Sequence, residues 1–261
     1  MSEGRKFYDA NEAISHHAME YACDLTLLGV GNIWERLYSY GRIPLSSFWM
    51  HQFPREELLY DALISKENLA KRVLEAEWLE RPASINNNRW RIYNNRSIRT
   101  TPLSMQYKLY INLHPDSLIS EFNVILEHLT SYNVPAFKFA RDVQNIVRPD
   151  KFVAYLYDFE TMYLLGESLS KSLKSVNVQP LPFTAALDPL GVVSCGFDPP
   201  GKFREQFRAT SWRGFITQII VRSFAEGMRL MFEKASMIQY SLKKISTLGI
   251  DTKKWLPNKV I

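Results

Sequence analysis

The chain has 261 residues, 46% of them hydrophobic and 23% charged, a composition typical of a globular protein that can bury a sizeable core. No apolar run reaches the roughly 20 residues that a membrane-spanning helix needs. The first residues also lack the charged-then-apolar order of a secretory signal. We therefore expect a cytoplasmic protein that does not associate with a membrane.

Residues that commonly bind metals or form disulfides are sparse. Cys23 and Cys195 are the two cysteines and lie far apart in the sequence, and the five histidines show no metal-ligand spacing. We expect no metal and no cofactor. The formal net charge of +5 suits an anionic ligand, but an excess of this size is only a weak indication of nucleic-acid binding, which we do not expect.

The first 80 residues are predicted to be helical. Apolar positions between Pro54 and Trp78 form a helical stripe with a break near Ser65. The proline, asparagines and arginines of residues 82–104 favour a turn and a polar hairpin.

Three segments then show the alternation of β-strands: MQYKLYINL from Met105, PAFKFAR, and FVAYLY at 152–157. A helix from Asp116 to about Tyr132, capped by Asp116 or Ser117, separates the first two strands, and a parallel pairing of these two strands stays open.

A helix over Phe159–Lys174 is predicted next, followed by an irregular stretch over Gln179–Lys202 that includes GVVSCGFDPPGK as a loop. A final helix is expected to start near Ser211 and to run beyond Phe232. These elements indicate an α+β fold with a largely antiparallel sheet flanked by helices and a helical N-terminal part. We expect residues 1–82 to form that helical part and residues 83–261 the α+β domain, together in one compact unit.

Cations and polar groups gather on the non-core faces of the three predicted strands. They are Lys108, Tyr110, Asn112, Lys138, Tyr155 and Tyr157. Arg141 and Arg148 follow the second strand, and Arg213 opens the last helix, where free backbone N–H groups favour a phosphate. A polar strand face is usually only solvated. Lys138 is more unusual, because two phenylalanines flank it on a strand expected to be central.

Several strings in this chain resemble the HopA-type family, named for a type III effector of a plant pathogen. The family also includes lyases encoded in gene clusters for class V lanthipeptides and thioamide-containing peptides. The resemblance is carried by KLYINLHP, AFKFAR and RPDKFVAYL, and later by PLPFTAALDPLGVVSCGFDPP and TSWRGFITQIIVRSFAEG. It covers about residues 100–230 and depends on the order and spacing of short motifs.

The same order of strands is similar to the phosphothreonine lyases of animal pathogens and to the lyase domains of class III and IV lanthipeptide synthetases. This resemblance implies that Lys108 binds phosphate and that Lys138 lies in the region that supplies the base. It also implies that Arg148 and Arg213 are phosphate-binding arginines.

The same resemblance implies that Tyr155 or Tyr157 corresponds to the pocket tyrosine. Asn112 and Arg141 are further candidates for substrate contact because of their places on the polar face of the first strand and after the second strand. Tyr110 stands where phosphothreonine lyases have a general-acid histidine, although the HopA-type pattern has tyrosine there. Either Tyr110 donates a proton to the leaving phosphate, or the phosphate leaves without that help.

The implied function is a metal-independent lyase that removes phosphate from phosphoserine or phosphothreonine in a peptide and leaves dehydroalanine or dehydrobutyrine. The resemblance further implies lanthipeptide-type biosynthesis, with a phosphorylated precursor peptide that carries a leader. The chain has no kinase signature, so a separate kinase, bound or unbound, must supply the phosphate. The first 80 residues could bind the leader or the kinase, although a structural cap is their ordinary use.

Three other functions stay open on the sequence. The chain could be a non-catalytic effector-like or scaffold protein that binds a protein partner. It could bind nucleic acid through RWRIYNNRSIR, with an affinity that falls steeply with salt. It could also be a different enzyme that acts on a phosphorylated small molecule.

Overall fold

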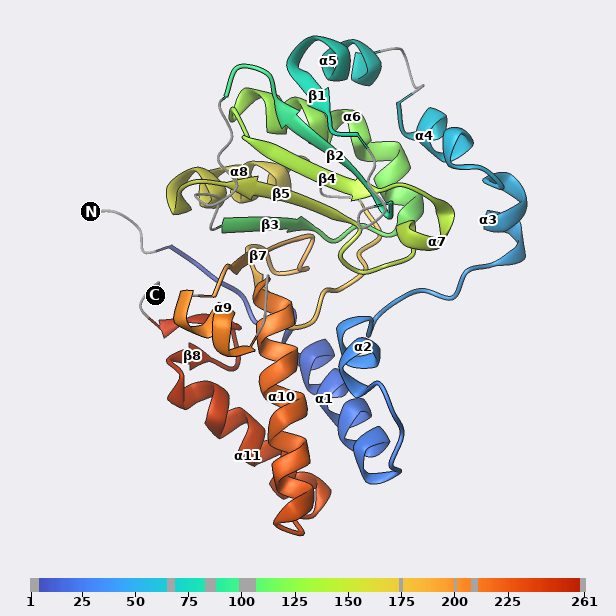
Figure 1. Cartoon of the computed structure of the whole chain (residues 1–261). Coiled ribbons are helices and arrows are strands. Elements are labelled where there is room, and N and C mark those ends of the chain that lie inside the picture. Colours follow the sequence, from blue (N-terminus) through green and yellow to red (C-terminus); the bar gives the residue numbers. More distant parts are fainter. Residues whose placement is uncertain are drawn as a thin grey trace. The chain divides into compact units, whose positions relative to one another are not determined.

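The computed structural model describes residues 5–64, 69–82, 88–98, 107–173, 176–199, 201–207 and 211–258. Within them a seven-stranded sheet has the order β1-β2-β4-β5-β3-β7-β6 (Figure 1). Its strands are β1 (Trp78–Glu80), β2 (Trp90–Asn95), β3 (Tyr107–Ile111), β4 (Ala136–Ala140), β5 (Phe152–Leu156), β6 (Ala185–Ala186) and β7 (Val193–Phe197). The predicted α+β class with an antiparallel sheet and a helical N-terminal part is confirmed.

Helices precede, separate and follow these strands. They are α1 (Glu12–Leu27), α2 (Ile33–Tyr38), α3 (Ser47–Gln52), α4 (Glu56–Ile64), α5 (Leu69–Glu77), α6 (Pro115–Ser131), α7 (Val143–Ile146), α8 (Phe159–Ser172), α9 (Gly201–Phe207), α10 (Trp212–Arg229) and α11 (Lys234–Thr247). A small pair, β8 (Ile250–Asp251) and β9 (Leu256–Pro257), lies near the C-terminus. In the described part of the chain, no helix is both long and apolar enough to span a membrane.

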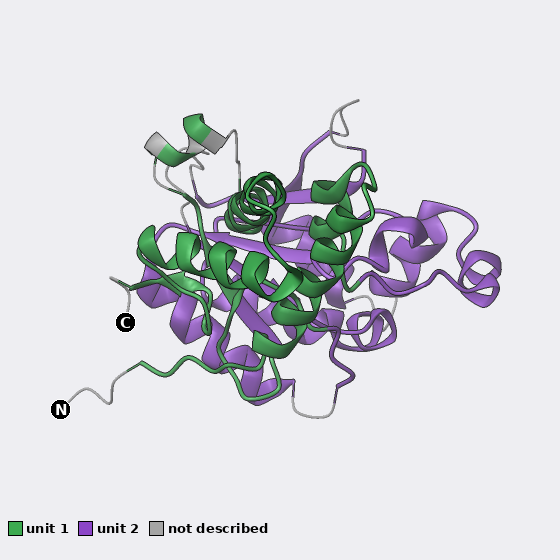
Figure 2. Ribbon diagram, turned by 90° about the horizontal axis from the view of Figure 1, so that it is seen from below, with its two compact units in different colours: residues 1–41, 180–191, 195–261 green, residues 42–179, 192–194 purple. Residues whose placement is uncertain are grey.

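The chain divides into two compact units, which Figure 2 shows in different colours. Unit 1 consists of Met1–Gly41, Pro180–Gly191 and Cys195–Ile261, and unit 2 of Arg42–Gln179 and Val192–Ser194. Both units are therefore discontinuous in sequence, and residue 82, the expected boundary, lies inside unit 2.

The central strands of unit 2 are all antiparallel to their neighbours. Strand β5 pairs with β3 on one side and with β4 on the other, and β4 pairs with β2. Strands β3 and β4 consequently run in the same direction but do not pair with each other. The parallel pairing that the sequence left open is not formed, because β5 lies between these two strands.

One face of this sheet carries a stack of aromatic rings. Phe137 lies 5.2 Å from Tyr93 and 5.6 Å from Phe152 between ring centroids, so the stack crosses β2, β4 and β5. Phe122 on α6 packs edge-on against Phe139 and Phe152. These rings are almost completely buried, and they explain why the alternating segments form adjacent strands under a helix.

Local signals account for most helix boundaries. The break predicted near Ser65 lies outside the described residues, between the end of α4 at Ile64 and the start of α5 at Leu69. Helix α6 begins one residue earlier than predicted. Pro115 occupies its first turn and His114, rather than Asp116 or Ser117, accepts the capping hydrogen bond, at 3.4 Å.

The final predicted helix is wrong in its extent. Helix α10 starts after the Ser211 cap as expected but ends at Arg229, and α11 follows it. Met231 has a φ of 56°, and the Phe232 N–H donates to the Gly227 carbonyl at 3.0 Å. This is a helix stop of the Schellman type with methionine, not glycine, in the left-handed position, which is why the sequence did not reveal it.

The irregular stretch predicted over Gln179–Lys202 is also corrected. It contains β6, β7 and the start of α9, and the expected loop GVVSCGFDPPGK includes all of β7. Every residue of β7 is buried. A fully buried strand lacks the alternation of polar and apolar residues that identifies a half-exposed one, so its small residues and glycines suggested a loop.

Candidate functional site

The strand register gathers predicted site residues on the sheet face opposite the aromatic stack. Lys108 on β3 stands directly across from Tyr155 on β5, and Lys138 on β4 stands across from Val153. Because side chains alternate along a strand, Lys108, Tyr110, Lys138 and Tyr155 all belong to this face. Strands far apart in the sequence thus bring two lysines and two tyrosines together.

Aromatic rings link the cations on this face. The Lys138 Nζ lies 4.1 Å from the ring centroid of Trp90 and 5.9 Å from that of Tyr155. The Lys108 Nζ lies 5.8 Å from the Tyr155 ring, and the Arg148 Cζ lies 5.3 Å from the Trp90 ring. We call these five residues the cation cluster; all of them lie in unit 2.

Arg148 is held by an acid two residues further along the chain, Asp150. Its Nε donates to Asp150 Oδ1 at 2.9 Å and its Nη2 donates to Asp150 Oδ2 at 3.1 Å, so the two side chains form a bidentate ion pair. Asp150 is only 5% exposed. The carboxylate orients the guanidinium and offsets one of the three positive charges of the cluster, so a net positive charge remains to attract an anion.

The cluster is accessible from solvent. Trp90, Lys138, Arg148 and Tyr155 are half-buried, whereas Lys108 is 6% exposed. Partly desolvated cations bind a phosphate more strongly than fully hydrated ones, because the surrounding medium screens the charges less. Two effects of opposite sign act on Lys138: the aromatic faces stabilise its ammonium form, and the neighbouring cations oppose it.

A third lysine, Lys151, immediately precedes β5. The Lys151 side chain is completely buried, and its Nζ donates to the Leu113 carbonyl at 2.6 Å. Burial lowers the pKa of Lys151 from 10.5 to about 7, and Asp150 partly opposes this shift. A buried lysine that loses its proton near neutral pH is a common feature of functional sites.

The other polar residues of the predicted strands lie in different settings. Tyr110 is 3% exposed and stands across from Val153, on the same strand face as Lys108. Asn112 is completely buried, and its Nδ2 donates to Ser194 Oγ at 2.9 Å, which ties the end of β3 to β7. Tyr157 follows β5 and is half-buried.

Arg141, the residue that follows β4, takes part in an ion-pair network with acidic side chains. Its Nη1 lies 3.2 Å from Glu56 Oε1, and its Nε donates to the Trp90 carbonyl at 3.4 Å. Arg91 shares Glu56 and also pairs with Glu80 at 3.0 Å. The geometry therefore links Arg141 and Arg91 to acidic side chains.

Arg213 belongs to unit 1, near the start of α10, and is completely buried. Its Nη2 donates to the Tyr38 carbonyl at 2.7 Å, and its Nε donates to the Pro182 carbonyl at 3.2 Å. Its guanidinium also lies over the Tyr38 ring, at 4.6 Å. Within unit 1 these contacts join α2, the segment before β6 and α10.

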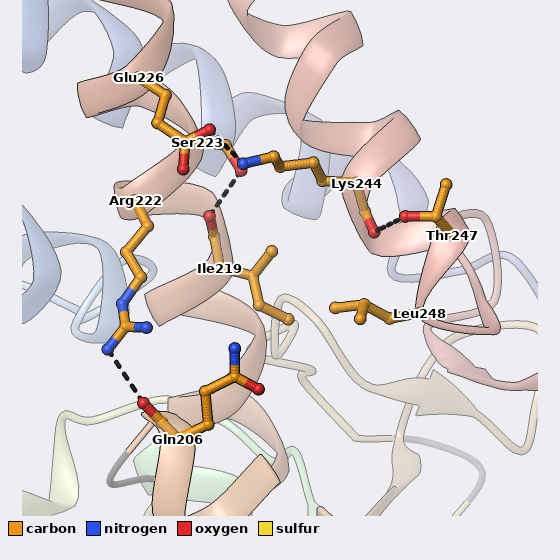
Figure 3. A pocket seen from close by; sticks show the side chains of 8 residues that line it. All are labelled: Gln206, Ile219, Arg222, Ser223, Glu226, Lys244, Thr247 and Leu248. Atoms are coloured by element: carbon orange, nitrogen blue, oxygen red, sulfur yellow. Dashed lines mark hydrogen bonds and ion pairs between the residues drawn. The ribbon is translucent and has the colours of Figure 1, made fainter.

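A pocket of about 260 Å³ lies in unit 1, between α9, α10 and α11 (Figure 3). Glu226 and Lys244 form an ion pair at one end, and Arg222 donates to the Gln206 carbonyl at the other. Ile219 contributes an apolar wall. None of the predicted site residues lines this pocket.

Sequence reasoning missed Trp90 of the cation cluster, its partner Asp150, and the buried Lys151 that follows Asp150. Trp90 was interpreted as part of a basic surface segment, since nothing local shows that β2 pairs with β4. Asp150 and Lys151 are part of the string RPDK. An acid two positions after an arginine can pair with it, and this spacing is a signal that could have indicated Asp150.

Comparison with known proteins gives a likeness of fold. No family model matches the chain, and no curated protein matches its sequence. The solved structures similar to it include bacterial effectors. The effector protein from Pseudomonas syringae pv. syringae strain 61 has 12% identity and a TM-score of 0.54, with 94% of this chain and 98% of that chain covered.

Two further structures are similar to a lesser degree. The effector protein from Pseudomonas syringae pv. tomato strain DC3000 has 12% identity and a TM-score of 0.49, covering 95% of this chain and 98% of that one. The type III effector/phosphothreonine lyase OspF from Shigella flexneri has 10% identity and a TM-score of 0.37, covering 72% of this chain and 98% of that one. The first of these structures shows that this chain shares the fold of that protein.

Proposed function

We propose that the chain is a lyase that eliminates phosphate from phosphothreonine or phosphoserine in a peptide. The observation that carries the proposal is the cation cluster, in which Lys138 lies on the same sheet face as Lys108 and contacts the same indole as Arg148. An elimination needs a base for the α-proton and positive groups for the leaving phosphate. The cluster offers both within one half-buried surface.

The proposed reaction takes one proton from Cα and delivers another to the leaving phosphate. The neutral amine of Lys138 takes the proton from Cα of the phosphorylated residue, and the electron pair of that C–H bond forms a double bond between Cα and Cβ. The bond between Cβ and the phosphate oxygen breaks, and phosphate leaves with its electron pair. Lys108 and Arg148 stabilise the negative charge, and Tyr110 or water supplies a proton to the phosphate.

The test uses mass spectrometry of a phosphothreonine peptide and a phosphoserine peptide incubated with the whole protein and EDTA. Elimination leaves a dehydroamino acid, so the product is lighter than the substrate by one phosphoric acid and reacts with an added thiol. Hydrolysis by a phosphatase would instead restore the hydroxyl and give no thiol adduct. This difference separates a lyase from another enzyme that acts on phosphate esters.

Lys138→Met should lower the elimination rate by about 100-fold or more, since proton transfer by a positioned group typically contributes that much. The matched control is Lys171→Met, which removes an exposed lysine of α8 in the same unit. An unchanged rate in a folded Lys138→Met protein contradicts the assignment of the base. Circular dichroism of both variants verifies that they fold.

The substrate and the partners are further parts of this proposal. A precursor peptide with a leader, phosphorylated by a separate kinase, is the substrate expected in lanthipeptide-type biosynthesis. The experiment repeats the assay with candidate precursor and kinase supplied together. Conversion of the precursor but not of short phosphopeptides would support a requirement for the leader or the kinase.

One observation favours a second candidate function, a non-catalytic protein that binds a phosphorylated partner. Asp150 already occupies two donors of Arg148, so this arginine is less able to stabilise the charge of a leaving phosphate. Calorimetry with a phosphopeptide separates the two functions. Binding without any elimination, even with kinase and precursor present, would favour the binding protein.

A further inference from the structure

Trp90 is the residue of the cation cluster to which neither the sequence nor the comparisons give a role. It is the first residue of β2 and stands across from Ala140, two positions from Lys138 on the neighbouring strand. Ile92, two residues after Trp90 on β2, stands directly across from Lys138. Trp90 and Lys138 are therefore diagonal neighbours on one sheet face, a separation that a long aromatic side chain can span.

The indole of Trp90 is in contact with two cations from different parts of unit 2. Lys138 approaches it from β4 and Arg148 from the segment before β5, with distances of 4.1 and 5.3 Å to the ring. Two cations so close repel each other, and a partly desolvated aromatic face offsets some of this repulsion. The Trp90 backbone is anchored as well, because its carbonyl accepts from Arg141 Nε.

We propose that Trp90 is a positioning residue of the candidate site, whose indole holds the Lys138 ammonium beside the Arg148 guanidinium before substrate arrives. The catalytic use of these two cations rests on the proposed function, whereas the contact itself does not. In the resting protein the indole favours a charged Lys138, which attracts phosphate. Lys138 must lose its proton before it can act as a base, so Trp90 also sets the pH at which the site becomes active.

Other groups near Lys138 affect its charge as well. Its direct cross-strand neighbours, Ile92 and Val153, are apolar. On β5 the Tyr155 ring favours the ammonium, and Lys108 on β3 contacts the same ring and opposes it. Arg148 also opposes it, and Asp150, paired with Arg148, weakens that effect. Trp90 is the aromatic group nearest to the Lys138 Nζ among these contacts, so its removal should change the proton affinity of Lys138.

The experiment is a titration of Lys138 by NMR in the whole isotopically labelled protein, with its side-chain signal assigned by its loss in Lys138→Met. Trp90→Leu should shift the titration midpoint down by about 0.5 to 1 pH unit, and Trp90→Phe, which keeps a smaller aromatic face, by about half as much. The control is Trp49→Leu, since the Trp49 ring on α3 packs against Phe53, the residue that follows this helix. This control should leave the midpoint unchanged.

Elimination provides the second readout. In Trp90→Leu the rise of kcat/KM with pH should move to lower pH by the same interval, while its plateau falls roughly 10-fold because Lys138 is no longer positioned. A merely structural role would lower the plateau without moving the pH profile. If Trp90→Leu does not fold, the smaller shift in Trp90→Phe decides the question.

An identical Lys138 midpoint in wild type and the folded Trp90 variants overturns the proposal. If the wild-type protein never eliminates phosphate, the proposed function fails, but the titration still decides whether Trp90 holds Lys138. The two failures are therefore distinguishable.

Discussion

Two lysines of unit 2 illustrate how burial changes the chemistry of one residue type. Lys138 is half-buried between aromatic rings, which stabilise its charge, whereas Lys151 is completely buried beside the Leu113 carbonyl. A carbonyl accepts a hydrogen bond from either form of the amine, so it does little to compensate for the loss of water around the ammonium. The pKa of Lys151 is accordingly lowered to about 7.

This lowered pKa predicts a pH-dependent stability. Between about pH 7 and 10.5 the unfolded chain holds a proton on Lys151 that the folded protein releases, so the free energy of unfolding should rise with pH. The rise contributed by this group is at most about 1.4 kcal/mol for each pH unit. Lys151→Met should remove it, and chemical denaturation of both proteins at pH 7.5 and 8.5 measures the difference.

Other groups titrate in this range, and the comparison of two proteins removes their contribution. Burial raises the pKa of the Cys195 thiol, so that group lowers stability as pH rises above the ordinary pKa of a thiol. It does so equally in wild type and Lys151→Met. Equal slopes of stability against pH in the two proteins would contradict the assignment of a low pKa to Lys151.

At the scale of elements, β4 links the aromatic stack of unit 2 to the cation cluster, because its two faces carry different side chains. Phe137 and Phe139 point into the aromatic stack, and Lys138 between them points to the cation cluster. Cross-strand aromatic pairs stabilise the sheet beyond the simple burial of area. The strand that positions the proposed base is thus held by rings on its opposite face.

Phe137→Ala should lower the free energy of unfolding by about 3 to 5 kcal/mol, because a large buried ring is lost and a cavity remains. Phe137 is 0% exposed and contacts Trp78, Tyr93 and Phe152 from three different strands. Phe48→Ala on α3, where the ring is 68% exposed, is the matched control and should change stability by less than about 0.5 kcal/mol. Urea unfolding of the two variants measures both effects, and equal losses would contradict the role of the stack.

How far these elements could be predicted depends on their surroundings. The strands of Phe137 and Tyr155 were recognisable because one half-buried polar side chain, Lys138 or Tyr155, interrupts the buried apolar residues of each strand. Strand β7 was missed because both of its faces are buried. The end of α10 was missed because Met231 occupies a position that usually requires glycine.

At the scale of the whole molecule, the small excess of positive charge favours a single phosphate group over a nucleic acid as the ligand. The chain has 32 lysines and arginines against 27 aspartates and glutamates, an excess of only five. Several of its arginines, among them Arg91 and Arg141, are paired with acidic side chains. A strong attraction for long polyanions does not follow from so small an excess, whereas a local cluster suffices for one phosphate.

A phosphopeptide should therefore bind the protein at least about 10-fold more tightly than the same peptide without phosphate, and the preference should weaken as salt is raised from about 0.05 to 0.5 M. Calorimetry at several salt concentrations measures this preference in the wild-type protein. A nucleic-acid binder would show the opposite order, with an oligonucleotide bound more tightly than the phosphopeptide and a steeper dependence on salt. Equal binding of both peptides would contradict a phosphate site.

The sequence by itself determined which residues share a strand face. Alternation is a local property, so it placed Lys108 with Tyr110 on one strand and isolated Lys138 and Tyr155 on two others. It also indicated α6, whose apolar stripe lies within one continuous segment.

Only the tertiary structure decided which strands are neighbours. The contact of Trp90 with Lys138 requires β2 to pair with β4, the contact of Lys108 with Tyr155 requires β3 to pair with β5, and the ion pair of Arg141 requires α4. Strand pairing depends on the packing of segments distant in the sequence, and no local pattern encodes the identity of the partner. For this protein the sequence supplied the chemical groups, and the packing of the sheet brought them together.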